Sequence, residues 1–113
     1  MEKMKKIDFS IGIYDDISEN IKSKIKRESQ KCEIYGVGIY SDSIVIENFK
    51  TYPMKNAEER IAQVKALKDV DFVFSVSDRD PKKVQEVAED AYRAYMEENK
   101  KKKKQKSIRL VLL

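Results

Sequence analysis

The sequence contains no histidine, so any chemistry that the chain performs has to proceed without an imidazole. Its one cysteine, Cys32, excludes a disulfide framework and a cysteine-based metal cluster, which suits a reducing compartment; we expect it to pack as a small apolar residue. No apolar run approaches the ~20 residues of a membrane-spanning helix. The lysine-rich N-terminus also lacks the apolar stretch of a signal peptide. We therefore expect a cytoplasmic protein with no membrane span.

Charge is abundant but unevenly distributed. Hydrophobic residues make up 41% and charged residues 39% of the 113 residues, and the formal net charge is +4. Lysines 100–104 and Lys106 account for more than this excess, so the rest of the chain is close to neutral. No aromatic residues are interleaved with these lysines, which argues against base stacking and a specific nucleic-acid partner. We expect the run to be a solvated helix end or linker, with an anionic membrane or nucleic acid as the alternative ligand.

Short apolar stretches predict the strands. Residues 7–14 alternate isoleucine and phenylalanine with small or polar residues, as a half-buried strand does. Residues 33–40 and 71–77 are more continuously apolar, which is typical of parallel strands that are covered on both faces. Within 33–40, Gly36 and Gly38 predict the close approach of another backbone or of a ligand. The closing segment SIRLVLL predicts a fourth strand, with the lysine-rich residues 100–106 before it.

Helical periodicity occupies the segments between these strands. Residues 17–31 carry isoleucines at four-residue spacing, and residues 41–55 predict a loop with one short turn of helix or strand. Asn56 with Glu59 three residues later resembles a capping box at the start of a helix. Asp80-Pro81 predicts the start of another helix, whose apolar stripe over 81–99 is the most regular in the chain.

The order of elements predicts the fold class. Strands that alternate with helices form a parallel sheet with right-handed crossovers. We therefore expect one domain over residues 1–113, a Rossmann-like three-layer α/β/α fold with a parallel sheet of about four strands. Ligands bind at the carboxyl ends of such strands. The segments 14–16, 40–42 and 77–80 are then expected at the binding edge.

Several segments, taken together and in order, resemble a known family. GIYDD resembles the G-T-F-D turn of the cytidylyltransferases that act on glycerol-3-phosphate, phosphocholine or phosphoethanolamine. CEIYGVGIYSDS resembles their second strand, and FKTYPMKNAEERIAQVKALKDVDFVF resembles their lysine-containing loop, E-E-R helix and V-D segment. The match spans roughly residues 5–76. It implies a nucleotidyltransferase-like fold, a transferase activity with CTP rather than ATP, Mg²⁺ accompanying the nucleotide, and a phosphorylated alcohol as acceptor. Such enzymes are commonly homodimers, and the stripe over 81–99 is compatible with one.

The defining H-x-G-H motif of that family is missing. The corresponding window here is residues 18–21, where Ser18 and Ile21 stand at the histidine positions and Asn20 at the glycine. The family's histidines hold nucleotide phosphates and stabilise the charge that builds up during attack. Loss of one preorganised donor of this kind typically costs ~10²–10³ in rate. Ser18 still has a hydrogen bond to donate, whereas Ile21 has none, so efficient nucleotidyl transfer is not expected. The family's second phosphate signature, R-T-x-G-I-S-T-T, is also absent.

The resemblance nevertheless implies a set of phosphate-binding positions. In this sequence they are Gly12, Tyr14, Asp15, Ser18, Lys50, Lys55 and Arg60. The family places the loop lysines near a substrate phosphate and the E-E-R arginine near phosphate or holding the loop. Each also has an ordinary explanation: Asp15 and Asp16 as a turn and helix N-cap, the lysines as loop residues, and Arg60 as a surface ion-pair partner of Glu58 or Asp69.

Three functions follow from these observations. The first is a degenerate cytidylyltransferase-like domain that binds a nucleotide or phospho-alcohol with weak or no transfer. The second is an active nucleotidyltransferase that uses Ser18 and Arg60 on the phosphates and a loop lysine on the acceptor. The third is a structural or interaction module, in which the lysine run and the tyrosine-bearing helix 81–99 mediate assembly.

Overall fold

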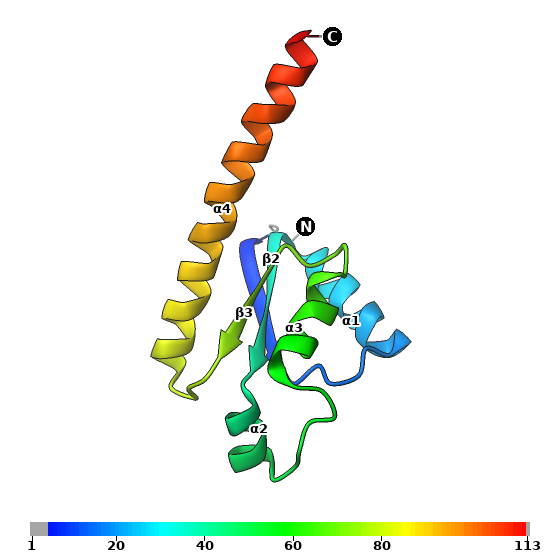
Figure 1. Cartoon of the computed structure of the whole chain (residues 1–113), viewed down its shortest axis with the longest axis vertical. Helices are drawn as coiled ribbons and strands as arrows, with labels where there is room; N and C mark the ends of the chain where they lie inside the picture. Colours follow the sequence, from blue (N-terminus) through cyan, green and yellow to red (C-terminus); the bar gives the residue numbers. More distant parts are fainter. Residues whose placement is uncertain (1–4, 113) are drawn as a thin grey trace.

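Strands and helices alternate along the chain as the sequence predicts. The computed structural model describes the backbone of residues 5–112 and the side chains of residues 6–99. The elements run in the order β1 Lys5–Gly12, α1 Glu19–Ser29, β2 Cys32–Tyr40, α2 Asp42–Phe49, α3 Ala57–Lys65, β3 Phe72–Val76 and α4 Pro81–Leu112 (Figure 1). No helix among these residues is long and apolar enough to cross a membrane.

The described strands form one parallel sheet in the order β1-β2-β3. Ile7 pairs with Ile34 and Gly12 with Ile39, and on the other side Gly36 pairs with Phe72 and Tyr40 with Val76. β2 is therefore the central strand, and β1 and β3 are the edges. The parallel α/β architecture is confirmed, with three strands in place of about four.

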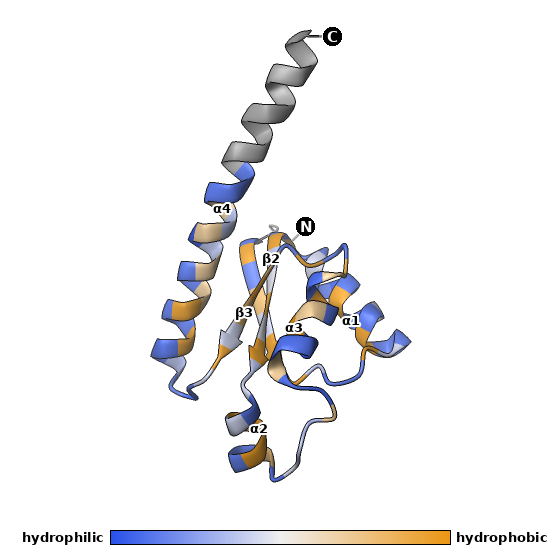
Figure 2. Cartoon of the chain, viewed as in Figure 1, coloured by the Kyte–Doolittle hydropathy of each residue, from blue (hydrophilic) through white to orange (hydrophobic). Residues whose placement is uncertain are grey.

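Helices cover both faces of the sheet, which makes three layers (Figure 1). On one face, the side chains of Tyr35, Val37 and Ile39 pack against Ile25 of α1 and Val64 of α3. On the other face, α4 packs its apolar stripe against a second cluster, made up of Phe72, Phe74 and Val76 with Ala88. Hydrophilic bands interrupt the hydrophobic ones along α1 and α4, as expected of helices with one buried face (Figure 2).

Two aromatic rings of β3 explain why β2 has glycine at positions 36 and 38. A Cβ atom on Gly36 would lie 2.3 Å from the Phe72 ring, and one on Gly38 would lie 2.7 Å from the Phe74 ring. The glycines are on the α4 side of the sheet, where the rings of the neighbouring strand lean over them. The prediction that Gly36 and Gly38 allow the approach of a backbone or ligand is therefore wrong, since side chains of β3 fill that space.

Two helix starts match their predicted caps. The Asn56 side chain accepts a hydrogen bond from the Glu59 N–H at 2.9 Å, and the Glu59 carboxylate accepts one from the Asn56 N–H at 3.4 Å, which completes the capping box. Asp80 Oδ1 accepts from the Lys82 N–H at 3.1 Å, at the first turn of α4.

Two expectations about secondary structure are wrong. Residues 42–49 form a full helix, because the Ser41 hydroxyl accepts a hydrogen bond from the Ile44 N–H and caps it. SIRLVLL does not form a fourth strand: residues 107–112 continue α4. No glycine or proline follows Pro81, and lysine, glutamine and leucine favour a helix, so nothing in the sequence ends α4 after the sheet. Leu113 lies outside the described residues.

Candidate functional site

Arg60 joins the carboxyl ends of the first two strands. Its side chain is fully buried, and its Nη1 donates hydrogen bonds to the carbonyls of Ile13 and Tyr40, both at 2.9 Å. Its Nε donates to the Lys55 carbonyl at 3.0 Å, and its Nη2 to Asp42 Oδ1 at 2.6 Å. The planar guanidinium holds β1, β2, the first turn of α2 and the loop before α3 in one fixed arrangement.

This geometry corrects one interpretation of Arg60. The expected surface ion pair with Glu58 or Asp69 is wrong, because the side chain has no exposed surface and its carboxylate partner is Asp42. The family-based alternative, in which this arginine holds the loop, agrees with its bond to the Lys55 carbonyl. A guanidinium that is enclosed in this way has no face left for a ligand.

Asp15 also binds the backbone of the loop before α3. Its two carboxylate oxygens accept hydrogen bonds from the backbone N–H groups of Met54 at 2.6 Å and Lys55 at 2.8 Å. The hydrogen bond from Met54, with that from Lys55 and the charges of Arg60 and Lys55, lowers the pKa of the Asp15 carboxyl below its usual value, although burial acts in the opposite direction. Neither Asp15 nor Asp16 is the N-cap of α1, because that position belongs to Ser18.

A pH-dependent loss of stability should follow from the Asp15 contacts. Since folding lowers this pKa, the carboxylate stabilises the fold above its unfolded pKa of about 3.9 and loses that contribution as the pH falls through the folded pKa. Asp15→Asn should lower the urea midpoint of unfolding at about pH 7. The difference in midpoint between the variant and the parent chain should become smaller at about pH 2.5. Asp16→Asn, on an exposed neighbour, is the matched control. An equal difference in midpoint at both pH values would show that the charged form of Asp15 does not stabilise the fold.

The two loop lysines, Lys50 and Lys55, have different environments. Lys55 Nζ donates a hydrogen bond to Gln63 Oε1 at 2.6 Å, which ties it to α3. Lys50 ends α2 in the left-handed conformation, with φ at 55°, and is exposed. Between them, the side chains of Tyr52 and Met54 are 80% and 88% exposed. The ammonium group of Lys55 is therefore bound by the protein itself, whereas Lys50 lies exposed at the end of α2.

A hollow of about 160 Å³ lies between the end of β1 and α1. Its lining includes Gly12, Tyr14, Ile21 and Lys24. Tyr14 adopts a left-handed backbone, with φ at 54°, and folds its ring back over Gly12; a Cβ there would lie 2.8 Å from the ring. Burial, followed by the Tyr35 and Glu28 charges, raises the pKa of Tyr14 to about 12, so the phenol keeps its proton at neutral pH.

Ser18 connects this hollow to the first turn of α1. Its hydroxyl oxygen accepts a hydrogen bond from the Ile21 N–H at 3.3 Å, and Ile21 itself lines the hollow. The side chain is exposed, so the hydroxyl hydrogen remains able to donate. The amides and dipole of a helix N-terminus favour an anion, although the exposed Glu19 carboxylate opposes one at the same turn.

Two residues of the candidate site were not predicted from the sequence. Asp42 is the ionic partner of Arg60, although the sequence placed residues 40–42 only generally at the binding edge. Lys24 lines the hollow, three residues after Ile21 and therefore on nearly the same helix face. That spacing was the available signal for Lys24. Nothing in the sequence marks Asp42, because its pairing depends on how α2 and α3 pack.

The described residues do not assemble a metal site. No group of three or more histidine, cysteine, aspartate or glutamate side chains within them is arranged to hold an ion. Both oxygens of Asp15 already accept backbone hydrogen bonds, and Asp16 alone is a poor ligand set for Mg²⁺.

Comparison with known proteins supports the fold. No protein-family model matches this sequence, and no curated protein matches it significantly. Among solved structures, the chain is similar to the lipopolysaccharide core biosynthesis protein from Thermoplasma volcanium GSS1, with a TM-score of 0.65 and 23% sequence identity. The likeness covers 75% of this chain and 69% of that one. It shows that this chain has a Rossmann-like α/β fold in common with a biosynthesis protein.

Proposed function

We propose that this chain is a nucleotidyltransferase-like domain that binds a phosphorylated ligand at the hollow between β1 and α1, with weak or no nucleotidyl transfer. The observation that carries the proposal is that Lys24, whose side chain ends in an ammonium group, and Tyr14, whose phenol keeps its proton, line the same hollow at the carboxyl end of β1. Both groups are hydrogen-bond donors, and both suit an anion. The cytidylyltransferase-like motifs favour CTP over ATP as the ligand.

The size of the hollow fits a part of the ligand. Pockets that enclose a whole small molecule usually have volumes of about 300–1,000 Å³. At about 160 Å³ this hollow is suited to a phosphoryl group, with the remainder of a nucleotide or phospho-alcohol lying outside it. Mg²⁺ would then arrive with the nucleotide phosphates, since the described residues provide no site of their own for it.

The hydrogen bonds of the charged side chains support the proposal of weak catalysis. Arg60 is enclosed by its own hydrogen bonds, Asp15 holds backbone amides, and Lys55 is bonded to Gln63. Phosphoryl and nucleotidyl transfer depend on cationic or hydrogen-bonding groups that stabilise the charge in the transition state. Of the two residues at the histidine positions of the altered motif, Ser18 is exposed and able to donate, whereas Ile21 has no side-chain donor.

Calorimetric titration with CTP and ATP, each with Mg²⁺, tests this proposal. We expect micromolar binding of CTP without pyrophosphate release, and an affinity about fivefold weaker for Lys24→Ala, the size of one exposed charge pair. Lys26→Ala, on the same helix but not in the lining of the hollow, is the control. No heat with either nucleotide would reject the proposal. Turnover that is abolished by Ser18→Ala would instead favour an active nucleotidyltransferase.

An interaction module is the second candidate. Its support is a group of large apolar side chains that remain exposed on α2 and the following loop: Ile46, Phe49, Tyr52 and Met54. Exposed apolar groups of this kind often mark contact surfaces. A chain that ignores every nucleotide and loses a protein partner after Tyr52→Ser and Met54→Ser would fit this function.

A further inference from the structure

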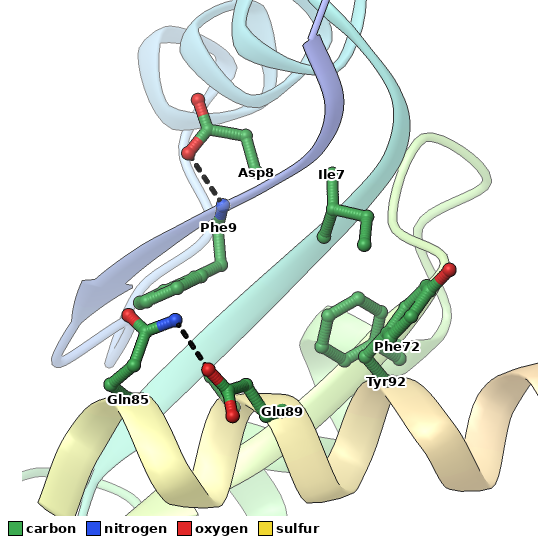
Figure 3. A pocket seen from close by; sticks show the side chains of 8 residues that line it. Ile7, Asp8, Phe9, Phe72, Gln85, Glu89 and Tyr92 are labelled. Carbon is green, nitrogen blue, oxygen red and sulfur yellow. Dashed lines mark hydrogen bonds between the residues drawn. The ribbon is translucent and has the colours of Figure 1, made fainter.

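A groove runs between β1 and α4, on the sheet face opposite the hollow between β1 and α1. Its lining includes Ile7, Phe9, Phe72 and Tyr92, and its volume is about 250 Å³ (Figure 3). α4 packs mainly against β3 and to a smaller extent against β2. The apolar side chains of Ile7, Phe9 and Ile11 on β1 are therefore only partly buried.

A second hollow continues the groove to the carboxyl end of β1. It has a volume of about 350 Å³ and passes Phe9 and Ile11 of β1 and Val84 and Gln85 of α4. Phe9 and Gln85 line both hollows, so the two form one passage, the β1–α4 channel, which follows β1 from Ile7 to Ile11. Four residues of a strand extend roughly 13 Å. The channel is therefore suited to a long, narrow ligand.

The middle of the β1–α4 channel is apolar. The Phe9 ring packs edge-on against the Phe74 ring, with centroids 5.6 Å apart, which fixes its place in the lining. Figure 3 shows the side chains of Ile7 and Phe9 reaching from β1 towards α4. On the α4 side, Gln85 Nε2 donates to Glu89 Oε1 at 3.1 Å, so these two polar groups bind each other. An apolar chain can lie here without leaving a buried polar group unpaired.

The end of the channel at the strand tips is polar, because Tyr40, Asp78 and Arg79 line it. Arg79 Nη1 donates to Asn48 Oδ1, a neutral amide, at 3.0 Å. The structure gives Arg79 no carboxylate partner among the residues whose side chains are described. Its Nε and Nη2 groups remain available, and such a pair of N–H groups can bind a carboxylate with two parallel hydrogen bonds.

The neighbouring carboxylate of Asp78 is already compensated. Its Oδ1 accepts a hydrogen bond from the Asp80 N–H at 2.8 Å, and its Oδ2 lies 3.3 Å from the Lys83 ammonium group. The hydroxyl of Tyr40, in contrast, forms no hydrogen bond with the side chains or backbone that the structure describes. This end of the channel thus offers a phenol donor and the uncompensated positive charge of Arg79.

We propose that the β1–α4 channel binds an acyl chain that ends in a carboxylate, the chemistry of a medium-chain fatty acid, with the carboxylate on Arg79 and the chain extending along β1 to Phe72. The charges set this direction, because Asp8 and Glu89 line the other end and repel a carboxylate there. The length of the channel favours a chain over a single ring, which would fill only part of it. The site lies across the sheet from the hollow of the proposed function and does not depend on that function.

Calorimetric titration of the full chain with decanoate, below its micelle-forming concentration, tests the proposal. We expect micromolar binding at one site per chain. Butyrate has the same head group and a shorter chain, and decyltrimethylammonium has the same chain and the opposite charge. Each should bind at least about tenfold more weakly than decanoate. No heat with decanoate, or equal affinity for decanoate and decyltrimethylammonium, would overturn the proposal.

Two pairs of variants locate the ligand. Arg79→Ala should weaken decanoate binding about tenfold, the usual effect of losing hydrogen bonds to a charged group. Asn48→Ala breaks the same Arg79–Asn48 hydrogen bond but keeps the guanidinium, so it should leave the affinity unchanged. Gln85→Trp obstructs the channel where its two hollows meet, and it should also weaken binding about tenfold. Glu86→Trp, on the exposed next residue outside the lining, is its control.

The urea midpoint of each variant confirms that it is folded, since all four positions are exposed. Decanoate binding that survives both Arg79→Ala and Gln85→Trp would place the ligand elsewhere and overturn the proposal. Equal losses in Arg79→Ala and Asn48→Ala would overturn the assignment of the carboxylate to the guanidinium.

Discussion

Replacing Arg60 with alanine should lower the free energy of unfolding by about 3–5 kcal/mol, the usual cost of removing one partner from a buried charged network. Four hydrogen bonds end at this guanidinium, and three of them satisfy backbone carbonyls of Ile13, Tyr40 and Lys55. Its removal leaves those carbonyls without a donor and Asp42 without its counter-charge. Urea unfolding followed by circular dichroism measures the change.

A loss of this size is a large share of the about 5–15 kcal/mol that stabilises a typical domain, so a gentler variant is needed beside it. Asp42→Asn removes the charge and keeps the shape, and it should cost less than Arg60→Ala because the Asp42 side chain is 43% exposed. Arg79→Ala is the matched control, since Arg79 is exposed and donates one hydrogen bond, to Asn48. Its unfolding midpoint should barely move. An equal, small effect of Arg60→Ala and Arg79→Ala would show that the buried network does not stabilise the fold.

The Arg60 variant also separates two roles for the position. A phosphate-binding arginine can be replaced with little effect on stability, and its loss appears in ligand affinity. Replacing a residue that joins strand ends has the opposite result: stability falls, and ligand affinity is not directly affected. Because the side chain has no exposed surface, we expect the loss in stability, with any loss of nucleotide affinity following from the disturbed loop between α2 and α3.

The sequence predicted the fold well because the fold depends on local pattern. Apolar runs, the capping box at Asn56 and the Asp-Pro start of α4 are properties of a few neighbouring residues, and the structure confirms each. The parallel order of β1, β2 and β3 follows from the alternation of strands and helices. Patterns of this kind need no knowledge of the tertiary contacts.

The end of the chain was mispredicted for a physical reason. An apolar run of six or seven residues is compatible with a buried strand or with a helix, and periodicity does not separate the two. A strand at 107–113 would also have required the chain to reverse within the lysine run. No glycine or proline is available there to make that turn, and α4 continues as a helix to Leu112.

The candidate site was harder to predict because charged residues have several uses. Arg60, Asp15 and Lys55 stand where family motifs place phosphate contacts, but each is engaged by the protein itself. Whether such a residue binds a ligand or the protein itself depends on the position of the seven-residue loop between α2 and α3. Tertiary packing determines that position. Lys24 shows the opposite case: an ordinary helix lysine reaches the hollow only because α1 lies beside the end of β1.

Gly36→Ala should destabilise the protein by about 2–3 kcal/mol, which is typical of overpacking in a core. Without this steric conflict, alanine would be favoured over glycine in a strand by roughly 0.5–1 kcal/mol. A decrease in the free energy of unfolding would therefore indicate overpacking. The added Cβ would lie 2.3 Å from the Phe72 ring. That ring cannot move aside easily, because the rings of Phe74, Tyr92 and Tyr95 surround it at centroid distances of 6.0–6.3 Å.

A double-mutant cycle with Phe72→Leu identifies the cause. Leucine removes the ring that meets the new methyl group, so Gly36→Ala should cost about 1–2 kcal/mol less in the Phe72→Leu background than in the parent chain. Phe72→Leu alone provides the reference for the lost aromatic packing. If the glycine served instead to let a ligand approach β2, Gly36→Ala would leave the unfolding midpoint unchanged and weaken nucleotide binding. Independent, additive effects of the two substitutions would likewise show that the Phe72 ring is not what requires a glycine at this position.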